Sequence, residues 1–332
     1  MDYTTIEPIK QRVSRVGLGT WAIGGWMWGG TDERQSIETI LSGLNRGINL
    51  IDTAPIYGFG VSEEIVGKAV AEYGNRDQVV LATKVALEKT DEGVIRNSSR
   101  DRILTEIEAS LKRLQTDYID IYQVHWPDAS VAFEETAATL QELYEKGMIR
   151  AIGVSNYSTE QMDAFQNAAP LHTSQPPYNL FERGIDDTLL PYCQERGIAL
   201  ITYGALCRGM LSGKMSSDRT FEGDDLRKGD PKFQPPRYEQ YLAAVDRLDR
   251  FAQENYNKRV IHLAVRWILD RGVHVALWGA RRPDQLDAAE AVAGWSLSDD
   301  ALAEIDRILA ETITDPVGPE FMAPPESEPA AA

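Results

Sequence analysis

Short apolar runs and longer amphipathic stretches alternate along the chain, which indicates a regular order of strands and helices. The apolar runs predict buried strands at Val16–Gly19, Asn49–Ile51, Val79–Thr83, Ile119–Gln123, Ala151–Val154, His172–Gln175, Ala199–Thr202 and Val275–Leu277. The stretches between them predict helices at Arg34–Asn45, Ser62–Glu72, Arg100–Leu114, Phe133–Lys146, Thr159–Asn167, Asp186–Arg196, Tyr238–Asn255, Val260–Asp270 and Pro283–Ala291. Ser158 and Ser298 are expected to begin helices.

Eight strand–helix units favour a closed (β/α)8 TIM barrel over an open doubly wound sheet. We therefore predict an α/β fold with one domain at residues 1–315 and a tail at residues 316–332. Three segments lie outside the repeat. Tyr3–Arg15 is expected to form a short β-hairpin that closes the barrel bottom, and Ser212–Arg237 is a long polar loop after strand seven. The tail, rich in Pro, Ala and Glu, is expected to be loose at its end.

Composition limits the partners of this chain. The 332 residues carry 51 acidic and 34 basic side chains, a net charge of −17, so nucleic acid and anionic membrane are unfavourable partners. Two cysteines, Cys193 and Cys207, cannot form a disulfide framework, and the sequence contains no recognisable metal-ligand set. Neither a signal peptide nor a membrane-spanning run is expected. We expect a cytoplasmic, monomeric enzyme that acts on small molecules.

Titratable side chains follow three neighbouring predicted strands, where barrel active sites lie. Asp52 and Tyr57 follow the second strand, Lys84 follows the third and His125 follows the fourth. Each alone is more often solvated or structural. Together they suggest a proton donor for reducing a carbonyl, or the base for oxidising an alcohol. An Asp52–Lys84 pair would keep a positive charge beside the Tyr57 phenol and lower its pKa, while His125 orients the carbonyl oxygen.

Several motifs accompany these four residues, and together they cover almost the whole chain. They are Gly19-Thr20-Trp21, Asp52-Thr53-Ala54 with Tyr57-Gly58, Gly153-Val154-Ser155-Asn156, Gln175-Pro176-Pro177-Tyr178-Asn179, Tyr203-Gly204-Ala205-Leu206 and Gly279-Ala280-Arg281. In these motifs the chain resembles the aldo-keto reductase superfamily, whose catalytic tetrad matches Asp52, Tyr57, Lys84 and His125 in identity and order. The runs Gly24–Gly30 and Ala205–Gly209 resemble its bacterial aldehyde-reductase and glycerol-dehydrogenase-like branch.

The resemblance implies a nicotinamide cofactor, NADP(H), bound across the barrel mouth without a Rossmann fingerprint. Matching positions imply that Ser155, Asn156 and Gln175 hold the carboxamide and that Tyr203 stacks on nicotinamide. The pyrophosphate clamp matches Gly204, Ala205, Leu206, Cys207, Arg208 and Lys214, and the 2′-phosphate end matches Arg281 and Gln285. Thr20, Trp21, Asp52, Gly279, Ala280 and Ala289 complete the implied cofactor contacts. Ala288-Ala289 departs from the Glu-Asn that the family often places near adenine.

The substrate pocket is expected to be aromatic, lined by Trp21, Trp28, Tyr57, His125 and Trp126. Such a pocket suits small neutral aldehydes, ketones or polyols. We also expect the long loop to fold over the cofactor, with Arg227 reaching the pyrophosphate. Two other readings are a channel-associated subunit that binds cofactor with little turnover, and a phosphate-binding barrel isomerase or aldolase. The last would leave Tyr57, Gln175 and Tyr203 without roles.

Overall fold

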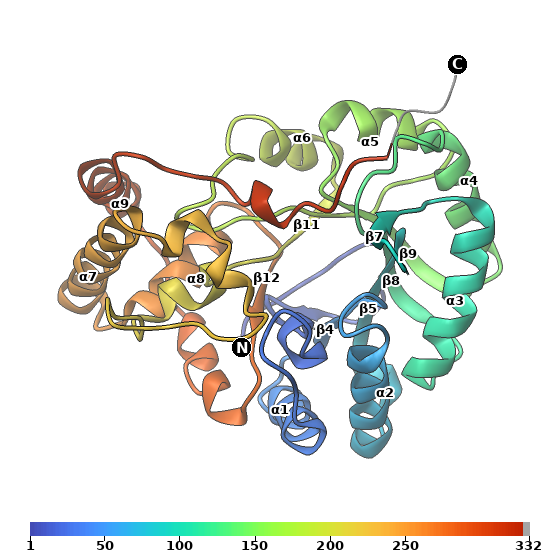
Figure 1. Ribbon diagram of the computed structural model, residues 1–332, viewed down its shortest axis with the longest axis horizontal. Helices are drawn as coiled ribbons and strands as arrows, with labels where there is room; N and C mark the ends of the chain where they lie inside the picture. Colours follow the sequence, from blue (N-terminus) through green and yellow to red (C-terminus); the bar gives the residue numbers. More distant parts are fainter. Residues whose placement is uncertain (328–332) are drawn as a thin grey trace.

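The computed structural model describes residues 1–327, and within them eight parallel strands close into a barrel (Figure 1). The barrel strands are β3 (Val16–Gly19), β4 (Leu50–Asp52), β5 (Val80–Val85), β8 (Ile119–Val124), β9 (Ile149–Ser155), β10 (Thr173–Gln175), β11 (Ala199–Thr202) and β12 (Val275–Gly279). Closure comes from β12, which pairs with β3 in a register that sets Ala276 opposite Val16. The predicted fold class is confirmed.

Helices form the outer ring, and their apolar faces pack on the strands (Figure 1). They are α1 (Glu33–Asn45), α2 (Val61–Tyr73), α3 (Arg100–Leu114), α4 (Phe133–Glu145), α5 (Thr159–Gln166), α6 (Leu189–Arg196), α7 (Arg237–Tyr256), α8 (Val260–Asp270) and α9 (Asp299–Thr312). The helix starts expected at Ser158 and Ser298 are confirmed, since each hydroxyl accepts a backbone N–H bond from the first turn.

One predicted helix is wrong. Residues Pro283–Leu286 and Ala289–Val292 form two short 3₁₀ turns instead of an α-helix at Pro283–Ala291. The Gln285 carbonyl, which an α-helix would give to a following amide, accepts a 3.2 Å bond from the Trp278 indole. The Gln285 side chain is also engaged, because its oxygen accepts bonds from the backbone N–H groups of Arg281 and Arg282.

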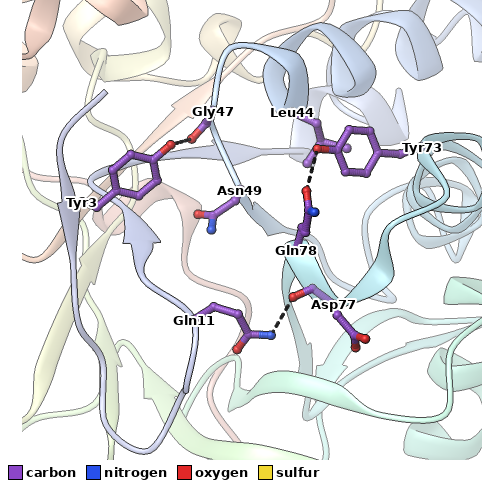
Figure 2. Close-up of a pocket in the computed structure, with 8 residues that line it drawn as sticks. All are labelled: Tyr3, Gln11, Leu44, Gly47, Asn49, Tyr73, Asp77 and Gln78. Atoms are coloured by element: carbon purple, nitrogen blue, oxygen red, sulfur yellow. Dashed lines mark hydrogen bonds between the residues drawn. The ribbon is translucent and has the colours of Figure 1, made fainter.

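The bottom of the barrel is closed by the expected N-terminal hairpin, β1 (Tyr3–Thr4) with β2 (Val13–Ser14). Ile6, Ile9 and Val13 from this segment join the apolar side chains that fill the barrel interior. Figure 2 shows the hollow left between the hairpin and the neighbouring α1 end, where the Tyr3 hydroxyl donates to the Gly47 carbonyl. Two further bonds are drawn there, from the Gln11 amide to the Asp77 carbonyl and from the Tyr73 hydroxyl to the Gln78 side-chain oxygen.

The opposite end, where the strands finish, carries two features that the sequence patterns did not indicate. A second hairpin, β6 (Leu87–Thr90) with β7 (Gly93–Arg96), follows β5. The chain after α9 then crosses from the α7–α9 side toward the β6–β7 side (Figure 1). The expectation that the tail is loose at its end falls on residues 328–332, outside the described residues.

Candidate active site

The four predicted catalytic side chains meet at the carboxyl ends of β4, β5 and β8. Lys84 and Asp52 form an ion pair with 2.6 Å between Nζ and Oδ1, and neither side chain is more than 3% exposed. The Lys84 ammonium also donates to the Thr53 carbonyl at 2.8 Å. Strand alternation explains the pair, because Asp52 and Lys84 both point to the barrel interior from neighbouring strands.

Tyr57 lies above this ion pair in the turn between β4 and α2. The Lys84 Nζ is 5.1 Å from the centre of the Tyr57 ring. His125 meets the ring edge-on with 5.6 Å between centroids, and Trp21 stacks beside it at 6.0 Å. Trp28 in turn packs edge-on against Trp21. The phenol therefore lies between a buried cation, an imidazole and an aromatic wall.

Burial controls the ionisation of the group. It lowers the pKa of His125 well below its ordinary value, with Lys84 adding to the effect, so the imidazole is neutral near neutral pH. Burial also lowers the pKa of Lys84, although Asp52 opposes this. The expected lowering of the Tyr57 pKa is wrong for this structure: burial raises it, and Asp52 and Tyr203 raise it further. The carboxylate of Asp52 opposes the field of Lys84 at the phenol.

The loops that carry Trp21 and Tyr57 are pressed together at two glycines. A Cβ on Gly58, which has φ of +64°, would fall 2.1 Å from the Gly24 carbonyl oxygen. A Cβ on Gly24 would fall 2.6 Å from the Tyr57 carbonyl carbon. No side chain fits at either position, so the backbone contact sets how far the aromatic wall stands from the phenol.

Amide and hydroxyl groups form the adjoining side of the mouth. The Gln175 amide donates to Asp52 at 2.8 Å, and the Ser155 hydroxyl donates to the Gln175 carbonyl at 2.7 Å. Asn156, in the left-handed region with φ of +61°, donates to the His125 carbonyl at 3.0 Å. The Tyr203 hydroxyl donates to the Asn156 side-chain oxygen at 2.9 Å. The structure thus brings together all four residues expected at the nicotinamide.

The segment after β11 is strained, and it departs from expectation in one respect. Cys207 and Arg208 both have positive φ, 45° and 53°, which non-glycine residues adopt at some cost. The Arg208 guanidinium is 3% exposed and pairs with Glu182 and Asp230. Its charge is balanced by these two carboxylates, which departs from a free Arg208 cation in the implied pyrophosphate clamp.

Hydrogen bonds connect three loops across the mouth of the barrel. The Asp224 carboxylate in the long loop accepts bonds from the backbone N–H groups of Met27 and Gly29, at 2.8 and 3.1 Å. The Arg281 guanidinium donates to the carbonyls of Trp28 and Gly30 at 2.7 and 2.5 Å. We call this set of contacts the loop clasp. It joins the loop after β3 to the long loop and to the end of β12.

The remaining predicted cofactor residues differ in their exposure to solvent and in their contacts. Arg227 bonds to Asp225 at 2.9 Å, and its guanidinium lies 4.3 Å from the Phe221 ring and 5.5 Å from the Trp28 ring. Lys214, Gly279 and part of Gln285 are accessible at the surface. Buried members contribute backbone or packing; they are Thr20, Ala205, Cys207, Ala280 and Ala289, with Gly204 and Leu206 partly buried.

The chain after α9 adds residues that the sequence interpretation missed. The Lys232 ammonium donates to the Gly318 carbonyl at 2.6 Å, and the Phe321 ring lies 5.4 Å from the Arg208 guanidinium. Arg96 donates to the carbonyls of Pro127 and Pro324, and it lies over the Trp126 ring at 5.2 Å. The tail therefore borders both the segment after β11 and the loop that holds Trp126.

Residues 1–327 contain neither a metal-ligand group nor a membrane-spanning helix. No group of His, Cys, Asp and Glu in this range is arranged to hold a metal ion. Within the same range, no helix is both long enough and apolar enough to cross a bilayer.

Comparison with known proteins agrees with this geometry. Residues 15–310 match the model of the aldo/keto reductase family. An aldo-keto reductase of Bacillus subtilis (strain 168), YhdN, is 61% identical over 99% of both chains. The structure of the glycerol dehydrogenase AKR11B4 from Gluconobacter oxydans superposes with a TM-score of 0.88 at 51% identity, over 97% of this chain and 99% of the other.

A more distant relative bears on the cofactor. The NADH-specific methylglyoxal reductase of Escherichia coli (strain K12) is 37% identical over 91% of this chain and 96% of its own. Fold, site and relatives define a nicotinamide-dependent oxidoreductase of the barrel type. The chain belongs to the aldo/keto reductase family.

Proposed function

We propose that this protein interconverts small neutral carbonyl compounds and their alcohols with NADP(H), acting on aldehydes, ketones or polyols of the glyceraldehyde and glycerol type. The observation that carries the proposal is the position of the Tyr57 phenol, between the buried Lys84–Asp52 pair and the neutral His125. The glycerol dehydrogenase likeness and the aromatic wall of Trp21 and Trp28 support the substrate class.

In reduction, Tyr57 donates its proton to the carbonyl oxygen as negative charge develops there. Its high pKa in the free protein keeps the phenol protonated and ready to donate. His125, neutral because of burial, donates a hydrogen bond to the same oxygen and orients it without adding a full charge. Lys84 stabilises the phenolate left behind, and Asp52 holds the ammonium in place. In oxidation Tyr57 acts as the base.

The residues at the mouth fit a nicotinamide dinucleotide. When bound, the cofactor supplies or accepts the hydride that no protein side chain provides. Ser155, Asn156 and Gln175 offer the amide and hydroxyl partners that a carboxamide needs, and Tyr203 offers a ring held by its bond to Asn156. The strained backbone at Cys207 and Arg208 supports a clamp for an anionic group there.

We assign the preference for NADP(H) over NAD(H) to Arg281. Its guanidinium lies at the end of β12 beside Gln285, and a 2′-phosphate would compete with the Trp28 and Gly30 carbonyls for it. The long loop, joined to this region by the loop clasp, would then cover the cofactor, and Arg227 would have to leave Asp225 to reach the pyrophosphate. The NADH-specific relative makes a direct comparison of both cofactors necessary.

The test is turnover of DL-glyceraldehyde, a wider aldehyde panel and glycerol with each cofactor, followed by nicotinamide absorbance. Tyr57→Phe removes only the phenol oxygen, so we expect kcat to fall by a factor of about 10² to 10⁴. NADPH affinity should stay near that of the unaltered protein. Binding of NADPH without turnover on any aldehyde would refute the enzymatic function.

A further inference from the structure

The first turn of α2 contacts the ends of three barrel strands through buried polar side chains. The Ser62 hydroxyl donates toward Thr20 Oγ1 at 2.8 Å and accepts a 2.9 Å bond from Thr53 Oγ1. All three hydroxyl-bearing residues are fully buried. The next residue, Glu63, is fully buried as well. The start of α2 is thus joined to the strand ends by buried hydrogen bonds as well as by apolar packing.

Glu63 divides its two carboxylate oxygens between two partners. One oxygen accepts a 2.6 Å bond from the Thr83 hydroxyl, and the other accepts a 2.6 Å bond from Arg113 Nε on α3. Arg113 is shared with a second buried carboxylate, Glu106, on its own helix. Glu63 thus spans the space between α3 and the strand that carries the catalytic lysine.

The contact between Glu63 and Thr83 connects the two chain segments that carry Tyr57 and Lys84. Thr83 immediately precedes Lys84, and strand alternation points its hydroxyl to α2 while the lysine points into the barrel. Glu63 follows the Tyr57 turn directly, and the Ser62 backbone N–H donates to the Tyr57 carbonyl at 3.2 Å. Glu63 is also near enough to Lys84 for its charge to raise the pKa of the ammonium, in the same sense as Asp52.

We propose that Glu63, through its bond to Thr83 and its pairing with Arg113, is a positioning residue that fixes the Tyr57 turn against the strand bearing Lys84. It touches neither substrate nor cofactor. It sets the separation of phenol and ammonium, a quantity to which the proton transfer is sensitive, because misplacement by about 1 Å can cost a hundredfold in rate. The inference rests on the proposed function in taking carbonyl reduction as its rate measurement.

The first experiment compares Thr83→Val with Thr83→Ser. Valine keeps the shape of threonine and removes the hydroxyl, whereas serine keeps the donor to Glu63. We expect Thr83→Val to lower kcat about tenfold with KM changed less than about twofold, and Thr83→Ser to stay near the unaltered enzyme. Equal kcat in both variants would overturn the proposal. Crystal structures of the pair supply a reading without turnover, namely whether the Tyr57 turn shifts away from Lys84 only in the valine variant.

The second experiment compares Glu63→Gln with Glu106→Gln. Both remove one buried carboxylate from Arg113, and Glu106→Gln removes a partner of Arg102 as well, so both should lower the melting temperature. Of the two variants, only Glu63→Gln should lower kcat and move the alkaline limb of its pH profile to lower pH. The reason is that Glu63, unlike Glu106, raises the pKa of Lys84. Identical pH profiles in the two variants would show a purely structural role.

A failure of the positioning role can be distinguished from a failure of the proposed function. A protein that reduces no aldehyde contradicts the proposed function, and the crystal structures of the Thr83 pair still decide the positioning role. A protein that reduces aldehydes equally well in both Thr83 variants contradicts the positioning role alone.

Discussion

The Lys84 ammonium and the Asp52 carboxylate form an ion pair from which water is excluded, 2.6 Å apart and reinforced on the carboxylate side by Gln175. Removing one partner leaves a buried charge uncompensated, which costs about 3 to 5 kcal/mol. We expect Asp52→Asn and Lys84→Met each to lose stability on that scale and to lose turnover.

The double variant Asp52→Asn with Lys84→Met tests the pairing itself. With both charges gone, most of the lost stability should return, because no unpaired ion remains. Activity should not return, since the phenolate has no cation beside it. Urea unfolding with parallel activity assays measures both. A double variant as unstable as the two single losses combined would contradict a direct pair.

His125 predicts how stability depends on pH. The pKa of His125 in the folded state lies well below the ordinary 6.5. As the pH falls through 6.5, the unfolded chain therefore takes up a proton at His125 and the folded chain does not. Stability contributed by the neutral imidazole is present above about pH 6.5 and falls by about 1.4 kcal/mol per pH unit below it.

Urea unfolding between pH 7.5 and 5.5 provides the measurement, and His125→Asn provides the control. The lowered pKa values of His172, His262 and His274 act in the same direction in both proteins and so cancel in the difference. An unchanged slope in His125→Asn would mean that this imidazole is protonated as readily in the folded chain as in the unfolded one.

The loop clasp predicts a protease-sensitive loop. Asp224→Ala removes the two side-chain bonds to the loop after β3 and leaves the backbone bond from Leu226 to Met27, so residues 213–237 should be cut faster, and bound NADPH should slow the cutting of the unaltered protein. Asp218→Ala is the matched control, because that exposed carboxylate bonds within its own turn, at Ser216. If saturating NADPH leaves the cutting rate unchanged, the long loop does not cover the cofactor.

Arg281 predicts cofactor selectivity. Arg281→Gln should raise KM for NADPH about tenfold, the worth of one or two charge-assisted hydrogen bonds, while KM for NADH stays nearly the same. Arg282→Gln is the control, since that exposed arginine pairs with Asp284 next to it. A similar rise for both cofactors would assign Arg281 to the loop clasp instead of to the 2′-phosphate.

Much of this architecture could be predicted from sequence because parallel barrel strands are buried on both sides and so appear as apolar runs. Side chains just after such runs must meet at one end, which is how Asp52, Lys84 and His125 could be grouped. The roles proposed for the group depended on resemblance, since spacing alone does not distinguish a phenol donor from a packed tyrosine.

What could not be predicted follows from contacts between distant segments. The β6–β7 hairpin is mostly solvent-facing and lacks an apolar run, although Thr90-Asp91-Glu92-Gly93 is a turn signal that could have indicated it. Glu63 is an acidic residue in a first helical turn, where such residues are common, and its partners Thr83 and Arg113 come from other elements of the fold. The neutralisation of Arg208 depended on Glu182 and Asp230, which no local pattern connects to it.

The contact between Gly24 and Gly58 has a consequence for altering substrate scope. Because the two backbones are in contact, a side chain at either glycine would push the loop bearing Trp21 away from the loop bearing Tyr57. Mutant libraries should therefore keep both glycines and vary residues farther out on the same loops, such as Trp26, Trp28 and Phe59. Selection for a larger substrate would then reshape the rim while the reacting centre keeps its spacing.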